Sequence, residues 1–206
     1  MPSPAYFDAI AEGARHHASS KTYSGSLLRP HKSFLSEMVE RLDCTSGLDW
    51  GAGKGTQYAW VDPSDGLTLE RAWGFKVRKY DPCWVPYAAE PVGKFDLVIC
   101  THTLALIPVQ DLDWVLGHLY AHAAKAVFIA EKIGGRKKHE VADPNNRAIC
   151  WSPEQWMATI SPAAAAHPEI ETALSIRVRE PRGTITTRHI WREGAFVGSF
   201  EAIPRG

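Results

Sequence analysis

Residues 48–57 hold the side chains and spacings most suited to chemistry in this chain. The segment contains a carboxylate, three glycines and a lysine in the order Leu-Asp-Trp-Gly-Ala-Gly-Lys-Gly-Thr-Gln. Glycine has no Cβ, so a ligand can lie directly against the backbone of such a loop. The loop can grip phosphates through its backbone N–H groups, or it can hold a nucleotide-like cofactor that carries positive charge. The spacing therefore predicts a nucleotide or cofactor site.

The residues around these glycines favour a cofactor without phosphates. A P-loop requires a further glycine separated by four residues from its Gly-Lys pair, and Leu48 occupies that position. Asp49 would repel phosphates from inside the loop. S-adenosylmethionine (SAM) carries an ammonium group and no phosphate, so a carboxylate at a strand end favours its binding. The spacing Gly51-x-Gly53-x-Gly55 is also tighter than the G-x-G-x-x-G of NAD sites. A P-loop and a purely structural glycine turn are the alternatives.

The composition predicts one ordinary domain over residues 1–206. With 45% hydrophobic and 22% charged residues, the chain can bury a sizeable core. The 23 basic and 23 acidic side chains balance, so no overall field attracts nucleic acid, although a local basic patch leaves that partner open. The four cysteines show no zinc-binding spacing, so we expect no metal and a reduced, cytoplasmic setting. No apolar run of about 18 residues predicts a membrane span.

Hydrophobic periodicity predicts an alternating α/β order, with residues 1–46 as an N-terminal helical segment. We expect a mostly parallel sheet flanked by helices and ending in an antiparallel strand pair. The stretch from Asp81 to Asp96 is short, so the third strand is expected to be truncated or absent. Helices are predicted over residues 4–18, 29–42, 67–73 and 109–122 and from Ser152 onward, and strands over 47–50, 75–80, 95–101, 126–131, 170–179 and 184–192.

This order resembles the Rossmann-like fold of class I SAM-dependent methyltransferases over residues 25–195. The resemblance is carried by residues 48–55, by Tyr80-Asp81-Pro82 and by residues 95–100. The chain looks most like short, stand-alone methyltransferase-like proteins of bacteriophages and bacteria. Those tend to continue after the fourth strand as T-D-V-L-E-H-I-P, where this chain has Thr-His-Thr-Leu-Ala-Leu-Ile-Pro at residues 101–108. Histidine thus replaces the aspartate of that pattern.

Methylation of DNA bases loses support from the same comparison of motifs. There is no D-P-P-Y or N-P-P-Y after the fourth strand. The Pro-Cys nucleophile of cytosine-C5 enzymes is also missing, because Cys83 follows a proline but lies after the second strand, and Cys100 follows Ile99. We therefore expect a small-molecule or nucleotide-like acceptor.

Two carboxylates are the main candidates for holding the cofactor. Asp81 ends a strand and can accept hydrogen bonds from both ribose hydroxyls, with a simple Asp-Pro turn as the alternative. Asp49 would face the ammonium group, or cap the following helix. Trp84 would stack on adenine, or pack at the rim. The predicted cofactor site comprises Asp49, Gly51, Ala52, Gly53, Gly55, Asp81, Trp84 and Thr101.

His102 is the predicted catalytic residue, because an imidazole at the carboxyl edge of a parallel sheet can remove a proton from an acceptor. A histidine bonded within its loop is the alternative. For substrate contacts we expect Glu131 at a strand end, Arg136 in a basic loop and Tyr23 in an N-terminal lid. A nucleoside phosphate kinase and a non-catalytic SAM-binding protein are the rival functions.

Overall fold

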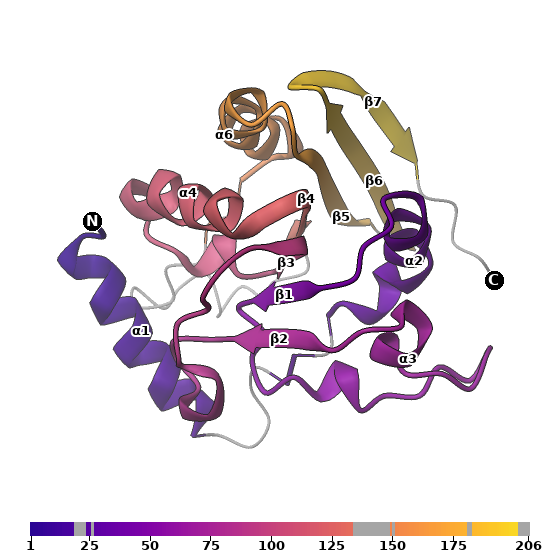
Figure 1. The fold of residues 1–206 in the computed structure, drawn as a ribbon. Coiled ribbons are helices and arrows are strands. Elements are labelled where there is room, and N and C mark those ends of the chain that lie inside the picture. Colours follow the sequence, from indigo (N-terminus) through magenta and orange to yellow (C-terminus); the bar gives the residue numbers. More distant parts are fainter. Residues whose placement is uncertain (19–23, 26, 134–148, 150, 181–182, 202–206) are drawn as a thin grey trace.

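The fold is an α/β structure built on one mixed sheet. The computed structural model describes residues 1–18, 24, 25, 27–133, 149, 151–180 and 183–201. In these residues the strands follow the order β2-β1-β3-β4-β5-β6-β7, so that β2 and β7 form the two edges (Figure 1). The predicted class, a mostly parallel sheet with flanking helices and C-terminal antiparallel strands, is confirmed.

The elements agree closely with the predicted ranges. The helices are α1 (Pro4–His17), α2 (Lys32–Arg41), α3 (Leu69–Trp73), α4 (Leu112–His122) and α6 (Pro153–Ala166), with short 3-10 turns such as Arg29–His31 and Thr56–Tyr58. The strands are β1 (Gly47–Trp50), β2 (Val77–Tyr80), β3 (Phe95–Thr101), β4 (Ala123–Ile133), β5 (Glu171–Glu180), β6 (Gly183–Arg192) and β7 (Ala195–Glu201).

Strands β1 to β5 are parallel, and the direction changes at the C-terminal end. Strand β6 pairs antiparallel with β5, as expected, and β7 adds a further antiparallel strand that the sequence did not predict. Strand β7 follows a tight turn at Glu193 and Gly194, both with positive φ. Most of its side chains are exposed, and the buried alternation that identifies a strand is therefore missing.

No additional strand forms between β2 and β3, as the short stretch from Asp81 to Asp96 predicts. Residues 81–94 are all described, and they contain a single 3-10 turn (Val85–Tyr87) and no strand. The chain passes from the edge strand β2 across β1 to β3 through this short connection. The carboxyl ends of β1 and β2 are thereby left next to the same irregular segment, which carries Asp81 and Trp84.

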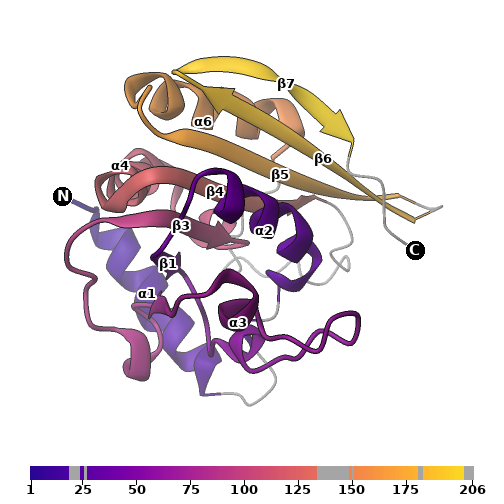
Figure 2. The ribbon, with the colours of Figure 1, turned by 45° about the vertical axis from the view of Figure 1, so that its right-hand side comes forward.

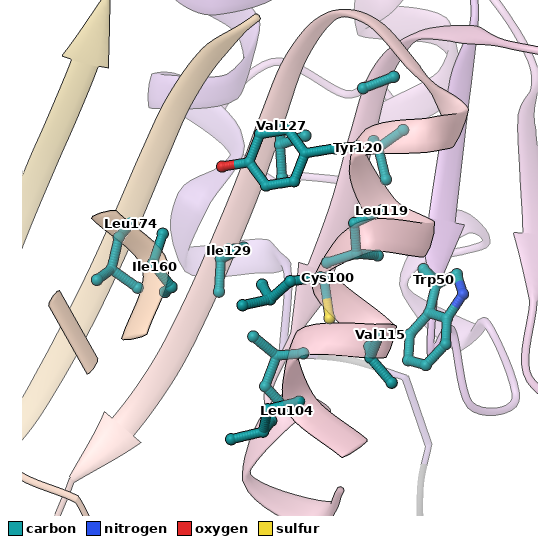
Figure 3. Close-up of a cluster of buried hydrophobic side chains, with 14 of the residues drawn as sticks. Trp50, Cys100, Leu104, Val115, Leu119, Tyr120, Val127, Ile129, Ile160 and Leu174 are labelled. Atoms are coloured by element: carbon teal, nitrogen blue, oxygen red, sulfur yellow. The ribbon is translucent and has the colours of Figure 1, made fainter. Parts of the chain in front are cut away.

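Two apolar layers cover the sheet, one on each face. Residues of α1, α4 and α6 pack on one face with Trp50, Val127 and Leu174, and Figure 3 shows how α4 lies over this layer. Residues of α2 and α3 pack on the other face with Ile99 and Phe128, and Figure 2 shows α2 beside the sheet from this side. No helix in the described ranges is both long and apolar enough to cross a bilayer.

The start of α6 was predicted from its capping residues, and the structure explains why the prediction is correct. The Ser152 hydroxyl accepts from the backbone N–H of Gln155, and the Gln155 side chain accepts from the backbone N–H of Ser152. This reciprocal pair forms a capping box, and Pro153 occupies the first helical position, where its missing N–H costs nothing.

Candidate functional site

The glycine loop after β1 has a backbone that requires glycine. Gly51, Gly53 and Gly55 have φ values of 83°, 57° and 63°. This left-handed region disfavours residues with a side chain. A Cβ on Gly51 would also lie only 2.2 Å from Oγ1 of Thr103, which follows β3. The loops after β1 and β3 therefore touch at the carboxyl edge of the sheet, where the strand order reverses and where such folds bind ligands.

The backbone N–H groups of this loop have acceptors within the protein. In a P-loop the corresponding groups point at phosphates. Here Gly51 and Ala52 donate to the carbonyl of Tyr80, Gly53 donates to Asp81, and Thr56 and Gln57 donate to the carbonyls of Ser24 and Gly25. A phosphate in this loop would have to displace these hydrogen bonds.

Asp49 is a fully buried carboxylate beneath the loop. Its Oδ2 accepts hydrogen bonds from Gln57 Nε2 at 2.7 Å and from the Tyr58 hydroxyl at 2.8 Å. Its Oδ1 is buried and has no hydrogen-bond partner among the described residues. Burial raises the pKa of the Asp49 carboxyl to about 6, while the two hydrogen bonds lower it. An unpaired buried carboxylate oxygen is costly, so this atom is a candidate contact for a bound cation.

Asp81 lies at the end of β2 and links this strand to the glycine loop. Its Oδ2 accepts from the backbone N–H of Gly53 at 2.8 Å, and its Oδ1 accepts from the backbone N–H of Cys83 at 2.9 Å. The Asp-Pro turn and the contact with the loop are therefore both present. Each carboxylate oxygen has two lone pairs, so these bonds leave acceptor capacity for ligand hydroxyls.

The C-terminal end of α1 reaches Asp81 and Trp84. Nε2 of His17 lies 3.8 Å from Asp81 Oδ2, and the His17 ring stacks on Trp84 with centroids 5.3 Å apart. The ammonium of Lys54 lies 5.4 Å from the centroid of the same indole ring. Burial lowers the pKa of His17, and the charge of Asp81 opposes that effect. The indole predicted to stack on adenine is thus in contact with two side chains of the protein itself.

The segment before α2 packs directly on the glycine loop. A Cβ on Gly25 would lie 2.2 Å from the carbonyl oxygen of Ala52, so these two backbones are in close contact. The backbone N–H of Leu28 donates to Gln57 Oε1, which connects this segment to the side chain that binds Asp49. Tyr23, predicted to contact substrate in a lid, lies outside the described residues.

His102 occupies a strained position immediately after β3. Its φ is 55°, which is uncommon for a residue with a side chain, and its backbone N–H donates to Ala130 at 2.7 Å. Nε2 is buried and has no hydrogen-bond partner among the described residues. Burial, together with the nearby Arg177 and Lys132, lowers the pKa of His102 to about 4. The imidazole is therefore neutral at pH 7, and its Nε2 has an unused hydrogen-bonding capacity among the described residues.

The remaining predicted residues are placed unequally. Thr101 is buried at the end of β3, two residues after Ile99, which pairs with Asp49. Thr101 and Asp49 therefore share a face of the sheet. Glu131 is buried on the opposite face, where its carboxylate accepts from the backbone N–H of Ala105 at 3.4 Å. The structure thus does not bring Glu131 to the side of Asp49. Arg136 lies outside the described residues.

Sequence patterns did not identify several residues of this edge. Gln57 and Tyr58 bind Asp49, yet they follow the glycine motif without a recognisable spacing of their own. His17 belongs to the first helix, and the contact with Asp81 exists through tertiary packing alone. Arg177 stands in a predicted strand and Lys132 directly follows one, and only the strand register places the two side by side.

A groove lies elsewhere, between α4 and α6. Its volume is about 540 Å³, and its lining includes Leu116, Tyr120, Trp151 and Pro162. None of the predicted site residues lines it. Comparison of the chain with protein-family models, curated proteins and solved structures gave no match.

Proposed function

We propose that this protein is a SAM-dependent methyltransferase that acts on a small-molecule or nucleotide-like acceptor. The observation that carries the proposal is the unpaired, buried Oδ1 of Asp49 beneath a loop of three left-handed glycines. A carboxylate in that position suits a ligand with an ammonium group and disfavours one with phosphates. The backbone hydrogen bonds that already occupy the loop N–H groups support the same choice.

The residues present fit this cofactor. Asp49 would hold the ammonium group, Asp81 would accept from the ribose hydroxyls, and Trp84 would stack on the adenine in place of its contact with His17. Bound SAM would supply an electrophilic methyl group. The neutral His102 would orient the acceptor or take a proton from it, since its low pKa keeps the ring deprotonated at neutral pH. Gly51, Ala52, Gly53, Gly55 and Thr101 would shape the floor of the site.

Two alternatives make different demands on the same residues. A nucleoside phosphate kinase would need Lys54 and the loop N–H groups on phosphates, which the hydrogen bonds to Ser24 and Gly25 oppose. A non-catalytic SAM-binding protein is favoured by one observation, the weak basicity that a pKa of about 4 gives to His102.

Calorimetry with SAM, with S-adenosylhomocysteine and with ATP tests the proposal. We expect the two SAM-related ligands to bind and ATP not to. Asp81→Ala should weaken SAM binding by ~1 to 3 kcal/mol, the cost of losing a charge-assisted hydrogen-bond partner. Asp113→Ala, at an exposed position on α4, is the matched control. Binding of ATP alone, or equal SAM affinity in both variants, would overturn the proposed cofactor site.

A further inference from the structure

Basic side chains gather on one face of the sheet, near the carboxyl end of β4, in the second half of β5 and in the middle of β6. Lys132 on β4 stands directly opposite Arg177 on β5 in the parallel register. On the next pair, Ser175 is opposite Arg188, so Arg188 is a diagonal neighbour of Arg177. Residues two apart on a strand point to the same face, which places these three cations together. Like charges in such positions repel one another and destabilise a sheet.

Two histidines extend this cationic cluster toward the glycine loop. His31 is fully buried, its Nδ1 lies 3.5 Å from Ser175 Oγ, and its ring packs 5.2 Å from that of Phe128 on β4. His102 approaches from the end of β3. Burial lowers the pKa of His31 to about 3, and Arg188, Arg177 and His102 lower it further, so these groups are close enough to interact.

Three buried nitrogens of this cluster lack hydrogen-bond partners among the described residues. They are Nε2 of His31, Nε2 of His102 and Nε of Arg188. In the same part of the chain, no carboxylate forms an ion pair with Lys132, Arg177 or Arg188. Burial lowers the pKa of Arg188, and the charge of Glu37 on α2 only opposes that effect. The guanidinium carbon of Arg188 lies 4.4 Å from the centroid of the Phe34 ring. Buried donors and repelling cations are costly unless an anion binds them.

From this geometry we infer that Lys132, Arg177 and Arg188 bind a phosphate-like anionic group of the methyl acceptor. The assignment of that anion to the acceptor rests on the proposed function. One guanidinium group can bind two phosphate oxygens at once, through two parallel N–H···O hydrogen bonds. Neighbouring strands are about 4.8 Å apart, so β5 lies roughly 15 Å from β1 along the edge. A phosphorylated compound of nucleotide size can span this distance, with its reactive atom beside His102.

Titration calorimetry at low ionic strength tests the inference. The probes are inorganic phosphate, pyrophosphate, a nucleoside monophosphate and the parent nucleoside, each with and without SAM. We expect the phosphate-bearing probes to bind and the nucleoside to bind ~10-fold or more weakly. Arg177→Gln and Arg188→Gln should each weaken phosphate binding by ~10-fold or more while SAM affinity is unchanged. Arg71→Gln and Lys94→Gln, both at exposed positions, are the matched controls.

A second measurement follows thermal stability, first without any ligand and then with added phosphate. Because like charges oppose one another in the cluster, Lys132→Gln and Arg177→Gln should melt at the same or a higher temperature than wild type in phosphate-free buffer. Added phosphate should raise the melting temperature of wild type and of the controls, and not that of the variants. Phosphate binding without SAM binding would support the anion site and contradict the proposed function. Equal phosphate affinity in wild type and both arginine variants, or equal affinity for nucleoside and monophosphate, would overturn the inference.

Discussion

Replacing Asp49 with Asn separates the structural cost of this buried carboxylate from its proposed role. Asparagine retains an oxygen that can accept from Gln57 and Tyr58, and it removes the negative charge. The proposed function requires that charge for the cofactor ammonium. We therefore expect Asp49→Asn to lose ~10-fold or more in SAM affinity. Without ligand, the free energy of unfolding of the variant at pH 7 should increase slightly.

The size of the stability effect follows from the pKa of Asp49. The carboxyl pKa rises from 3.8 to about 6 on folding, so between these pH values the folded protein binds more protons than the unfolded chain. The contribution of Asp49 to stability therefore falls as the pH rises through this window. At pH 7 the charged form costs on the order of 3 kcal/mol, of which about 1 kcal/mol is regained on going to pH 5. The unpaired amide of asparagine costs about 1–3 kcal/mol, so the net gain at pH 7 is small.

The pH dependence of unfolding is consequently the decisive measurement. Urea titrations of wild type and Asp49→Asn between pH 5 and pH 7 should show the variant gaining about 1 kcal/mol relative to wild type as the pH rises. Asp113→Asn, at an exposed position, should show no such trend. If Asp49→Asn is destabilised by the same amount at every pH and still binds SAM as wild type does, the carboxylate is an ordinary structural group and our reasoning fails.

Three further predictions concern the loop and the two histidines. Gly51→Ala should cost several times more stability than Gly66→Ala, about 1–3 kcal/mol for backbone strain in each plus a steric clash at Gly51 alone; equal melting temperatures would contradict this. From pH 7 to pH 5, His102→Asn should lose about 2 kcal/mol less unfolding free energy than wild type, because unfolding raises the His102 pKa from about 4 to 6.5. Urea titrations at both pH values check this. With an identified acceptor, the same variant should lower turnover by ~10²-fold. His17→Ala should strengthen SAM binding by calorimetry, on the order of tenfold, by uncovering Asp81 and Trp84, whereas weaker binding would make His17 part of the site.

Most of the fold was predictable because its signals are local. Strand β3 contains the apolar run of residues 97–100, and α6 begins with a capping box, so neither depends on distant parts of the chain. Strand β7 was missed for the opposite reason. Its pairing with β6 is a tertiary event, and its mostly exposed side chains carry no buried alternation.

The candidate site divides in the same way. The glycine loop and Asp81 were predictable because each directly follows a strand, and parallel strands bring their carboxyl ends to one edge. The contact between His17 and Asp81 was not, since nothing near either residue encodes it. The pairing of Lys132 with Arg177 likewise depends on the register between β4 and β5, which a shift of one residue would abolish.

The distribution of charge along the sheet edge distinguishes the two functions that the glycine loop allows. The formal net charge of the chain is zero, yet buried Asp49 and Asp81 lie at the ends of β1 and β2, while the cations lie on β4, β5 and β6. A kinase would need the reverse order, with phosphates at the glycine loop. A positively charged cofactor and an anionic acceptor would each bind at the half of opposite charge, and the two would meet beside β3. His102 stands at that boundary with a neutral ring. The imidazole would therefore accept a proton there without attracting either the cofactor or the acceptor by charge.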